Sequence, residues 1–568
     1  MDNLPQELLD QILVSLPIQD LKNCLLVSRK CRHAAEQYAF SSVTLSPENA
    51  ENAIALYSGH RACYLREVKF QPILSSPDDS ISLDSAGSHL YRESASTLRI
   101  LDQEYTRQIA FLFSFLRTLE INRSENGTSN NLHLTIFLPV LVIDRTALPL
   151  QRCFVSWRIH LLNPTSLPLL DSIQTLSIAT PPLRSLTTAG DDQGLYLSVR
   201  KLDYRVLLDL ASRLPNLTTL RCRMGADDLF ANSLSSWYPV IYDELRYVCH
   251  DWVGPQRETR AAFSKALEGA ELRSLRHLNL DFLFPLGNIY VSDQRLQMPD
   301  LVGAHMCDPL SSSLGLLSDS LRTMCLRGIF DLTLFWPSDG DTLVWPNLEH
   351  LHVMFYMVTP SGLWYFDGPR DFLAEVDIET HVDTIEIDLY PPLEDNLRDR
   401  EETMDRDLRR ARYFFNYRIE PNEAVLTPFL TAFSKAAGRM PKLKTFELWS
   451  PLVWDLPEYI EYSWDISWVA EGTRDELCDA DMAWGVAYAS PGARMFPTDS
   501  SIPVSATRQL WWRTAGWRPQ EDLHRLFHCI GNAGGDEEIM DQYDPGKLLP
   551  AQGRKDFEAA AQHLSSLQ

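Results

Sequence analysis

Histidine pairs are the side chains in this sequence whose spacing comes closest to a metal or catalytic site. His524 and His528 lie four residues apart on an expected helix, so both imidazoles face the same side. A zinc site needs further ligands, and the helix offers no adjacent glutamate of the HExxH kind, so two surface histidines are the simpler interpretation. His350 and His352 alternate along an expected strand and predict no metal centre. We therefore expect neither a metal nor a cofactor.

Catalytic motifs are missing from the sequence, which has no GxSxG elbow, no P-loop and no GxGxxG after a strand. Acidic residues gather between 475 and 481, but a chain with a net charge of −24 forms such groups by chance. We expect that the chain is not an enzyme. The alternative is an enzyme whose site lies in the tryptophan-rich C-terminal region.

Composition narrows the class of protein and its partners. The 568 residues, 45% of them hydrophobic, are enough for several domains or one long solenoid. The net charge of −24 repels phosphate backbones and anionic lipid, so nucleic acid is not expected as a partner. No stretch reaches the roughly 18 apolar residues of a membrane helix, and no secretory signal is recognisable, so no membrane partner is expected either. The ten cysteines contain no CxxC pair and indicate reduced thiols in the cytoplasm or nucleus.

The first 45 residues have the pattern of three short helices. Residues 4–17, LPQELLDQILVSLP, place leucine and isoleucine on one face of a helix that Pro5 starts and Pro17 stops. Ser28 is placed to cap a later helix whose small and apolar residues recur at helical spacing: Cys31, Ala34, Ala35 and Tyr38. So small a unit has more apolar side chains than it can bury, which indicates that it packs against another protein.

These residues resemble an F-box. Leu-Pro at 4–5, Glu-Leu-Leu at 7–9, Asp-Leu at 20–21 and Val-Ser-Arg at 27–29 occur in the order of that motif, while His33 stands where many F-boxes carry tryptophan. The resemblance implies that the segment binds a Skp-family adaptor and, through it, a cullin-RING ligase. The adaptor-binding residues it implies are Leu4, Pro5, Leu8, Leu9, Ile12, Leu13, Leu16, Pro17, Leu21, Leu25, Val27 and Cys31.

A short phrase of the form LxxLxL recurs through the middle of the chain. The phrases are LREVKF (65), LRTLEI (116), IQTLSI (173), LTTLRC (217), LRHLNL (275), LRTMCL (321), LEHLHV (348) and LKTFEL (443). Alternating apolar residues of this kind predict strands of a parallel sheet whose inward leucines stack from one repeat to the next. In particular, residues 275–280, 321–326 and 348–353 are expected to be neighbouring strands.

Helical segments precede several of these phrases, at 204–217, 258–269 and 423–443. Strand and helix together predict an α/β leucine-rich-repeat-like horseshoe. The spacing between phrases is irregular, against roughly 20–29 residues in regular repeats, so insertions or unrecognised strands must lie between them. The alternative is that the phrases are strands of an unrelated α/β core.

Further phrases are similar to those of a group of filamentous-fungal F-box proteins, among them DWVGPQRETRAAFSKAL (251–267), LRGIFDLTLFWP (326–337) and RQLWWRTAGWRP (508–519). This resemblance covers most of the chain and implies the same architecture without naming a target. After residue 450 the repeat phrase stops and seven tryptophans follow, which predicts a subdomain that caps the open end of the repeats. The expected domains are an F-box (1–45), a leucine-rich-repeat-like domain (46–450) and a capping region (451–568).

The expected function is that of a substrate-recognition subunit of an SCF-type ubiquitin ligase. The F-box would hold the adaptor, and the repeat domain would present an unidentified protein target to ubiquitin carried elsewhere in the complex. Trp336 and Tyr365 are the exposed aromatic side chains that we expect to contact the target. The alternative within the interaction class is an F-box scaffold that binds the adaptor without directing ubiquitination.

Overall fold

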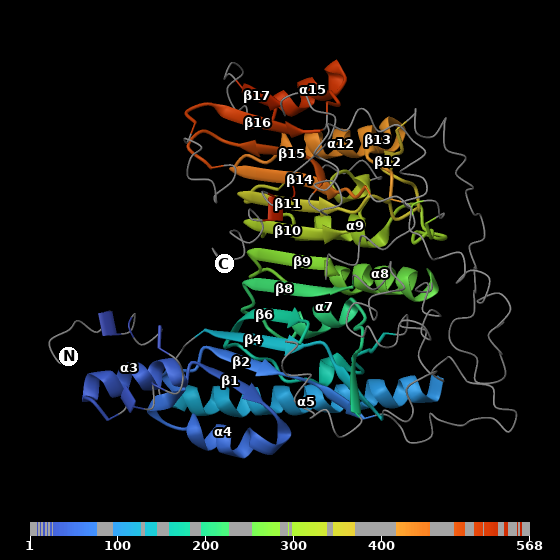
Figure 1. Cartoon of the computed structure of the whole chain (residues 1–568). Coiled ribbons are helices and arrows are strands. Elements are labelled where there is room, and N and C mark those ends of the chain that lie inside the picture. Colours follow the sequence, from blue (N-terminus) through green and yellow to red (C-terminus); the bar gives the residue numbers. More distant parts are fainter. Residues whose placement is uncertain are drawn as a thin grey trace, which may run out of the picture. The chain divides into compact units, whose positions relative to one another are not determined.

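The structure of this chain is a computed structural model. It describes residues 8–9, 12, 15–16, 20, 23–24, 26–75, 95–125, 131–144, 158–181, 195–225, 253–284, 294, 298–337, 345–369, 416–454, 482–494, 505–514, 516–531, 539–543, 554 and 557–558. The fold is mixed α/β, with a large and mostly parallel sheet (Figure 1). Two compact units divide the chain: unit 1 (Met1–Ser80, Thr97–Thr146 and Ile159–Arg221) and unit 2 (Ile81–Ser96, Ala147–Arg158 and Cys222–Gln568).

Unit 1 is built on parallel strands that lie side by side in chain order: β1 (Ser42–Leu45), β2 (Glu67–Phe70), β4 (Leu132–Phe137) and β6 (Ile173–Ala179). Strand β8 (Thr219–Gly225) follows β6. Apolar residues in register form a buried row across the strands: Leu45, Phe70, Ile136 and Ile178. This stacking of inward residues from strand to strand is the arrangement that the recurring phrase predicts.

The phrase LRTLEI at 116–121 was expected to be a strand, and this expectation is wrong. It lies inside α5 (Ala95–Glu125), the long helix of unit 1. The apolar residues of this stretch recur at helical spacing and are fully or almost fully buried: Leu101, Tyr105, Ile109, Leu112, Phe113, Leu116 and Leu119. Seven apolar positions at i, i+3, i+4 and i+7 outweigh one alternating phrase of six residues, so the helix forms.

Among its described residues, unit 1 also has shorter helices and a small second sheet. The helices include α3 (Arg29–Ala39), α4 (Ala50–Leu56) and α7 (Arg205–Ala211). In the second sheet, β5 (Val140–Asp144) pairs with both β3 (Ile73–Ser75) and β7 (Leu195–Val199). Helix α7 falls within the segment 204–217 that the sequence predicts to be helical, so that prediction is confirmed.

Unit 2 contains the parallel neighbours expected from the repeat phrase. Strands β9 (His277–Phe284), β10 (Thr323–Gly328), β11 (His350–Phe355) and β14 (Thr445–Pro451) lie side by side in this order (Figure 1). Leu280, Leu326, Val353 and Leu448 are in register, and each is almost fully buried. The prediction that 275–280, 321–326 and 348–353 are adjacent parallel strands is therefore confirmed.

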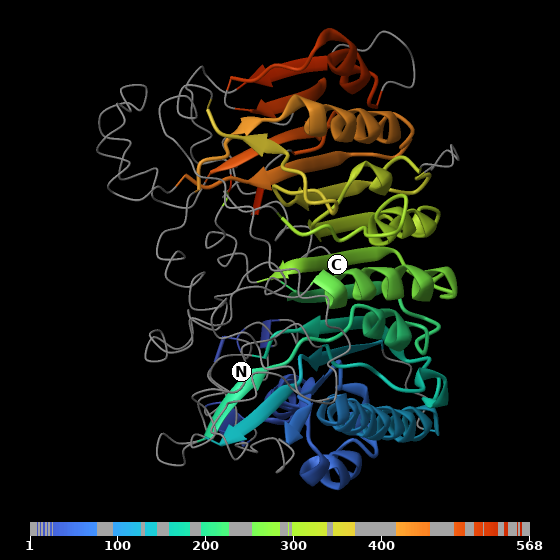
Figure 2. The ribbon, with the colours of Figure 1, turned by 90° about the vertical axis from the view of Figure 1, so that its right-hand side faces the viewer.

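Helices pack on one face of the strands of unit 2 (Figure 2). Ring contacts fix this face, since Phe263 of α8 meets Phe282 of β9 and Phe433 of α12 meets Phe446 of β14. The helices are α8 (Val253–Glu268), α9 (Pro309–Ser313), α12 (Glu423–Ala437) and α15 (Glu521–His528). The expected helices at 258–269 and 423–443 are thus present as α8 and α12.

The tryptophan-rich C-terminal region extends the strands of unit 2. Strand β15 (Ala483–Ala489) pairs antiparallel with β14, β16 (Arg508–Arg513) pairs antiparallel with β15, and β17 (Ile539–Tyr543) pairs parallel with β16. Trp484 and Trp512 are fully buried on the helix side of these strands. A short antiparallel ribbon is formed by β12 (Phe366–Asp367) and β13 (Glu420–Pro421). No described helix combines the length and the apolar character needed to cross a membrane.

Candidate functional site

Helix α3 of the N-terminal region forms as its sequence predicts. The Ser28 hydroxyl accepts a hydrogen bond from the amide of Cys31 at 3.2 Å, which caps the first turn. Ala34 and Ala35 are buried, and Leu16 and Cys24 from the preceding segment pack against them. Helix α3 therefore supplies the core of the N-terminal region.

Apolar side chains remain exposed on this region. The exposed fractions are 45% for Leu8, 48% for Ile12, 84% for Leu26 and 56% for Val27. Several large exposed aliphatic side chains within one short segment are the kind of surface that another protein covers. Leu26 was not among the expected contact residues. The signal for it was the run Leu25-Leu26-Val27 directly before the cap, since three consecutive apolar residues cannot all face the same core.

Two of the residues that the resemblance assigns to adaptor binding lie inside the region. Leu9 is 2% exposed and Cys31 is 3% exposed, so both pack within the domain. Leu8, Ile12 and Val27 are at the surface, and Leu16 is half-buried. The other residues of the set lie outside the described residues: Leu4, Pro5, Leu13, Pro17, Leu21 and Leu25.

Helix α3 contacts the segment that follows it in the chain, up to Tyr64. Glu36 forms an ion pair with Arg61 at 3.1 Å, and the guanidinium of Arg61 lies 4.6 Å from the ring centroid of Phe40. The hydroxyl of Tyr64 and Nδ1 of His33 are 2.7 Å apart, so the histidine that replaces the usual tryptophan has a partner inside this chain. These contacts join helix α3 and Phe40 to residues 61–64 of unit 1.

The strands of unit 2 have a second face, opposite the helices, that carries polar residues. In register on this face lie Asn279, Cys325, His352 and Glu447 of four neighbouring strands. His352 is fully buried there: its Nδ1 is 3.3 Å from a carboxylate oxygen of Glu447, and its Nε2 accepts a hydrogen bond from the indole of Trp449 at 3.0 Å. Because Nε2 accepts, Nδ1 carries the proton and the imidazole is neutral.

Because His352 is buried, we expect folding stability to depend on pH. Burial lowers the pKa of His352, and the hydrogen bond to Glu447 only partly opposes the shift. The unfolded chain therefore binds a proton below pH about 6.5 that the folded chain resists, so folding stability falls as the pH falls. We expect His352→Gln to remove up to about 1 kcal/mol of the loss between pH 6.5 and 5.5. Urea unfolding at both pH values measures it.

The control for that measurement is His305→Gln, because His305 is an exposed histidine in the same unit. The slope of folding stability against pH should be the same in His305→Gln as in the original chain. It should be shallower in His352→Gln. The slope is compared because loss of the bonds to Glu447 and Trp449 will lower stability at every pH. Equal slopes for all three proteins would show that His352 takes up a proton in the folded state.

The two aromatic residues expected to contact a target differ in position. Trp336 is half-buried, and its ring lies 4.7 Å from the guanidinium carbon of Arg439, which follows the C-cap of α12. Tyr365 was expected to be exposed, which is wrong, because it is 1% exposed. Its hydroxyl donates to the carbonyl oxygen of Phe330 at 2.9 Å and its ring packs on Phe355, so its place is in the core.

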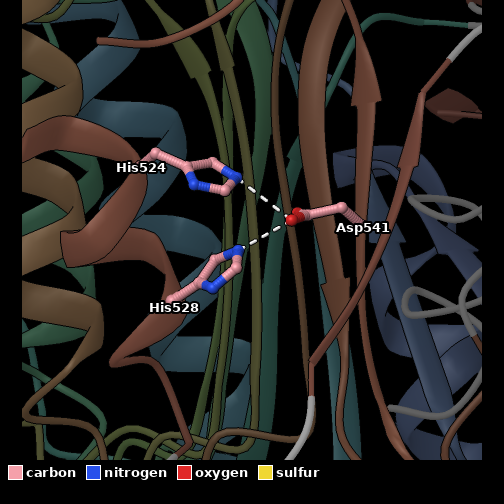
Figure 3. Close-up of side chains that lie close together, drawn as sticks. All are labelled: His524, His528 and Asp541. Carbon is pink, nitrogen blue, oxygen red and sulfur yellow. Dashed lines mark hydrogen bonds and ion pairs between the residues drawn. The ribbon is translucent and has the colours of Figure 1, made fainter. Parts of the chain in front are cut away.

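Three side chains at the C-terminal end of unit 2 could hold a metal ion: His524, His528 and Asp541 (Figure 3). The sequence indicated the two histidines but gave no third ligand. Asp541 belongs to β17, a strand that follows α15 after a separate segment, so local spacing could not reveal it. Among the residues that the structure describes, His350 and His352 belong to no such group; His350 bonds to Thr445 and His352 to Glu447.

Comparison with known protein families identifies the type of domain at the N-terminus. Residues 1–40 match the F-box domain. F-box domains bind Skp-type adaptors within cullin-RING ligases, which suggests a role in adaptor binding for this segment. F-box proteins are in general adaptor or receptor subunits rather than enzymes. No curated protein matches the chain in sequence.

Proposed function

We propose that this protein is the substrate receptor of an SCF-type cullin-RING ubiquitin ligase and acts in the cytoplasm or nucleus. The observation that carries the proposal is the set of exposed apolar side chains, Leu8, Ile12, Leu26 and Val27, within the segment that matches the F-box domain. Such side chains bury favourably against an adaptor, at about 25 cal/mol per Å² of apolar area removed from water. The receptor itself makes no covalent bond and acts by proximity.

The large remainder of the chain is proposed to be a leucine-rich-repeat-like domain that binds a protein target. Support comes from parallel strands whose inward residues stack in register, with helices packed on one face. The phrases shared with fungal F-box proteins are in keeping with this architecture. Part of the irregular spacing, between residues 65 and 173, comes from β4, a strand that the repeat phrase does not mark, and from the long helix α5, which contains the phrase at 116.

Target binding is proposed for the polar face of unit 2. Half-buried side chains on it can donate and accept hydrogen bonds, among them His277, Asn279, Arg327 and His350. His277 and His350 are each held by a threonine of the next strand, at 3.0 Å and 2.8 Å, and are thus oriented before a partner arrives. Groups fixed in this way lose little conformational entropy on binding.

The test is affinity purification of the full chain, compared with the variant Leu8→Asp plus Ile12→Asp, followed by mass spectrometry after proteasome inhibition. A deletion of residues 1–45 is less suitable, because it removes β1, which pairs with β2. We expect adaptor and cullin with the original chain only, and target proteins with both chains. Their ubiquitin conjugates should be depleted with the variant.

Recovery of the adaptor without any cullin would identify the chain as a scaffold and not a ligase receptor. Recovery of adaptor and cullin with both chains would show that the exposed residues do not form the contact. Conjugates that are equally abundant with both chains would likewise contradict the proposal, since the targets would then be modified independently of the F-box.

A further inference from the structure

The C-terminal end of unit 2 brings together residues that the adaptor and target functions do not use. Helix α15 buries Leu523 and Phe527 against the strands, which leaves His524 and His528 one turn apart at its side. Strand β17 pairs with β16, and Tyr543 stacks on Trp512 with their planes 12° apart. Asp541 lies two residues from Tyr543 on the same strand face and therefore points toward α15.

The three side chains converge on one point (Figure 3). Nε2 of His524 lies 3.0 Å from Oδ2 of Asp541, and Nε2 of His528 lies 2.7 Å from the same oxygen. The ligand atoms of all three residues lie within 4.8 Å of one another. Two nitrogens on adjacent helical turns and one carboxylate oxygen on a neighbouring strand form the three protein ligands of an open metal site.

A further contact holds the aspartate in this orientation. The indole Nε1 of Trp512 donates a hydrogen bond to Oδ1 of Asp541 at 3.0 Å, and Trp512 is fully buried. Oδ1 is thereby occupied, while Oδ2 is directed at the histidines. A ligating carboxylate oriented by a buried donor is a usual feature of metal sites in proteins, where such partners raise affinity.

The dimensions suit a small divalent ion of the zinc class. Zinc binds nitrogen and oxygen at about 2.0–2.1 Å, so two ligands at tetrahedral angles are about 3.3 Å apart. The nitrogen-to-oxygen distances of 3.0 Å and 2.7 Å must therefore widen by a few tenths of an ångström. The side chains are 29%, 34% and 19% exposed for His524, His528 and Asp541, so an ion and a water can enter. Imidazole ligands disfavour calcium and magnesium, which prefer oxygen.

We propose that His524, His528 and Asp541 bind a divalent cation of the zinc class, with water in the fourth position. The ion joins α15 to β17, which lies at the end of the strand order and has only half-buried and exposed side chains. A terminal strand with few buried contacts opens easily. An ion held from both sides ties this strand to the helix.

The test is zinc binding by the full chain after treatment with a chelator, measured by isothermal titration calorimetry with zinc chloride. We expect one ion at this site, and at least about 10- to 100-fold weaker binding in His528→Gln and in Asp541→Asn, since loss of a hydrogen-bond partner to a ligand already has that effect. His305→Gln, which changes an exposed histidine elsewhere in unit 2, should bind as the original chain does.

A second readout separates binding from folding. Zinc should raise the melting temperature of the original chain and of His305→Gln, because it binds the folded state, and it should not raise that of Asp541→Asn. Circular dichroism without zinc should be the same for all of them. The proposal is overturned if the original chain binds no zinc, or if His528→Gln and Asp541→Asn bind it unchanged, in which case the three residues form a hydrogen-bonded group alone.

Discussion

Replacement of Leu8 and Ile12 together by aspartate will abolish adaptor binding and leave both units folded. Both side chains are about half exposed, so they contribute little to the core of the F-box and are available to a partner. Removal of an apolar anchor from a well-packed interface commonly costs about 2–4 kcal/mol, and a buried unpaired charge adds a desolvation penalty. The pair of substitutions should therefore lower affinity by several orders of magnitude, as measured by calorimetry with the purified adaptor.

The matched control is Ile121→Asp combined with Leu169→Asp. These residues are 48% and 49% exposed in the same unit, outside the segment that matches the F-box domain. The control should bind the adaptor with unchanged affinity, which separates loss of the contact from the general effect of two added charges. If the F-box variant keeps its affinity while its circular dichroism is unchanged, the segment is a helical cap and the receptor proposal fails with it.

The strands of unit 2 were predictable because their signal is local and repeated. Four phrases place leucine or another apolar residue at alternate positions, so each phrase by itself predicts a strand. Repetition of the phrase along the chain then predicts that these strands are parallel neighbours. LRTLEI at 116–121 has the same pattern of apolar positions but forms part of α5. The apolar residues before it recur at helical spacing, and the phrase continues that spacing. A six-residue phrase does not decide between the two periods, whereas a window of thirty residues does.

The candidate sites were predictable only where one stretch of chain contains them. The F-box helix α3 and its cap at Ser28 follow from consecutive residues. The buried position of Tyr365 depends on the carbonyl oxygen of Phe330, which accepts from its hydroxyl, and on the ring of Phe429, and both come from distant parts of the sequence. Asp541 joins His524 and His528 through the pairing of β17 with β16, which local sequence does not encode.

The second large effect is expected in the interior of unit 2, where Arg260 of α8 pairs with Asp308. Asp308 is fully buried and Arg260 is 5% exposed. The guanidinium donates to Oδ1 at 2.7 Å and also to Oδ2, while the carboxylate accepts from the amide of Ser311 at 2.8 Å and so caps α9. The guanidinium also donates to the carbonyl of Ile329. One charge pair thus links α8, α9 and the end of β10.

Asp308→Asn should destabilise the protein by about 3–5 kcal/mol, because it removes the buried carboxylate that forms two hydrogen bonds with the guanidinium of Arg260. Asparagine keeps the size of the side chain and an oxygen that can cap α9, so the loss reports mainly the charge. Urea unfolding followed by tryptophan fluorescence measures it, since Trp449, Trp484 and Trp512 are buried in the same unit.

Two further variants make the measurement specific. Arg525→Ala removes an exposed partner of Asp522 in the same unit and should cost no more than about 1 kcal/mol. Arg260→Met combined with Asp308→Asn removes the buried cation together with its carboxylate partner and should recover part of the loss. A cost for Asp308→Asn as small as that of Arg525→Ala would mean that water reaches the guanidinium. No recovery in the double variant would mean that the hydrogen bonds, and not the charge, hold α8 and α9 together.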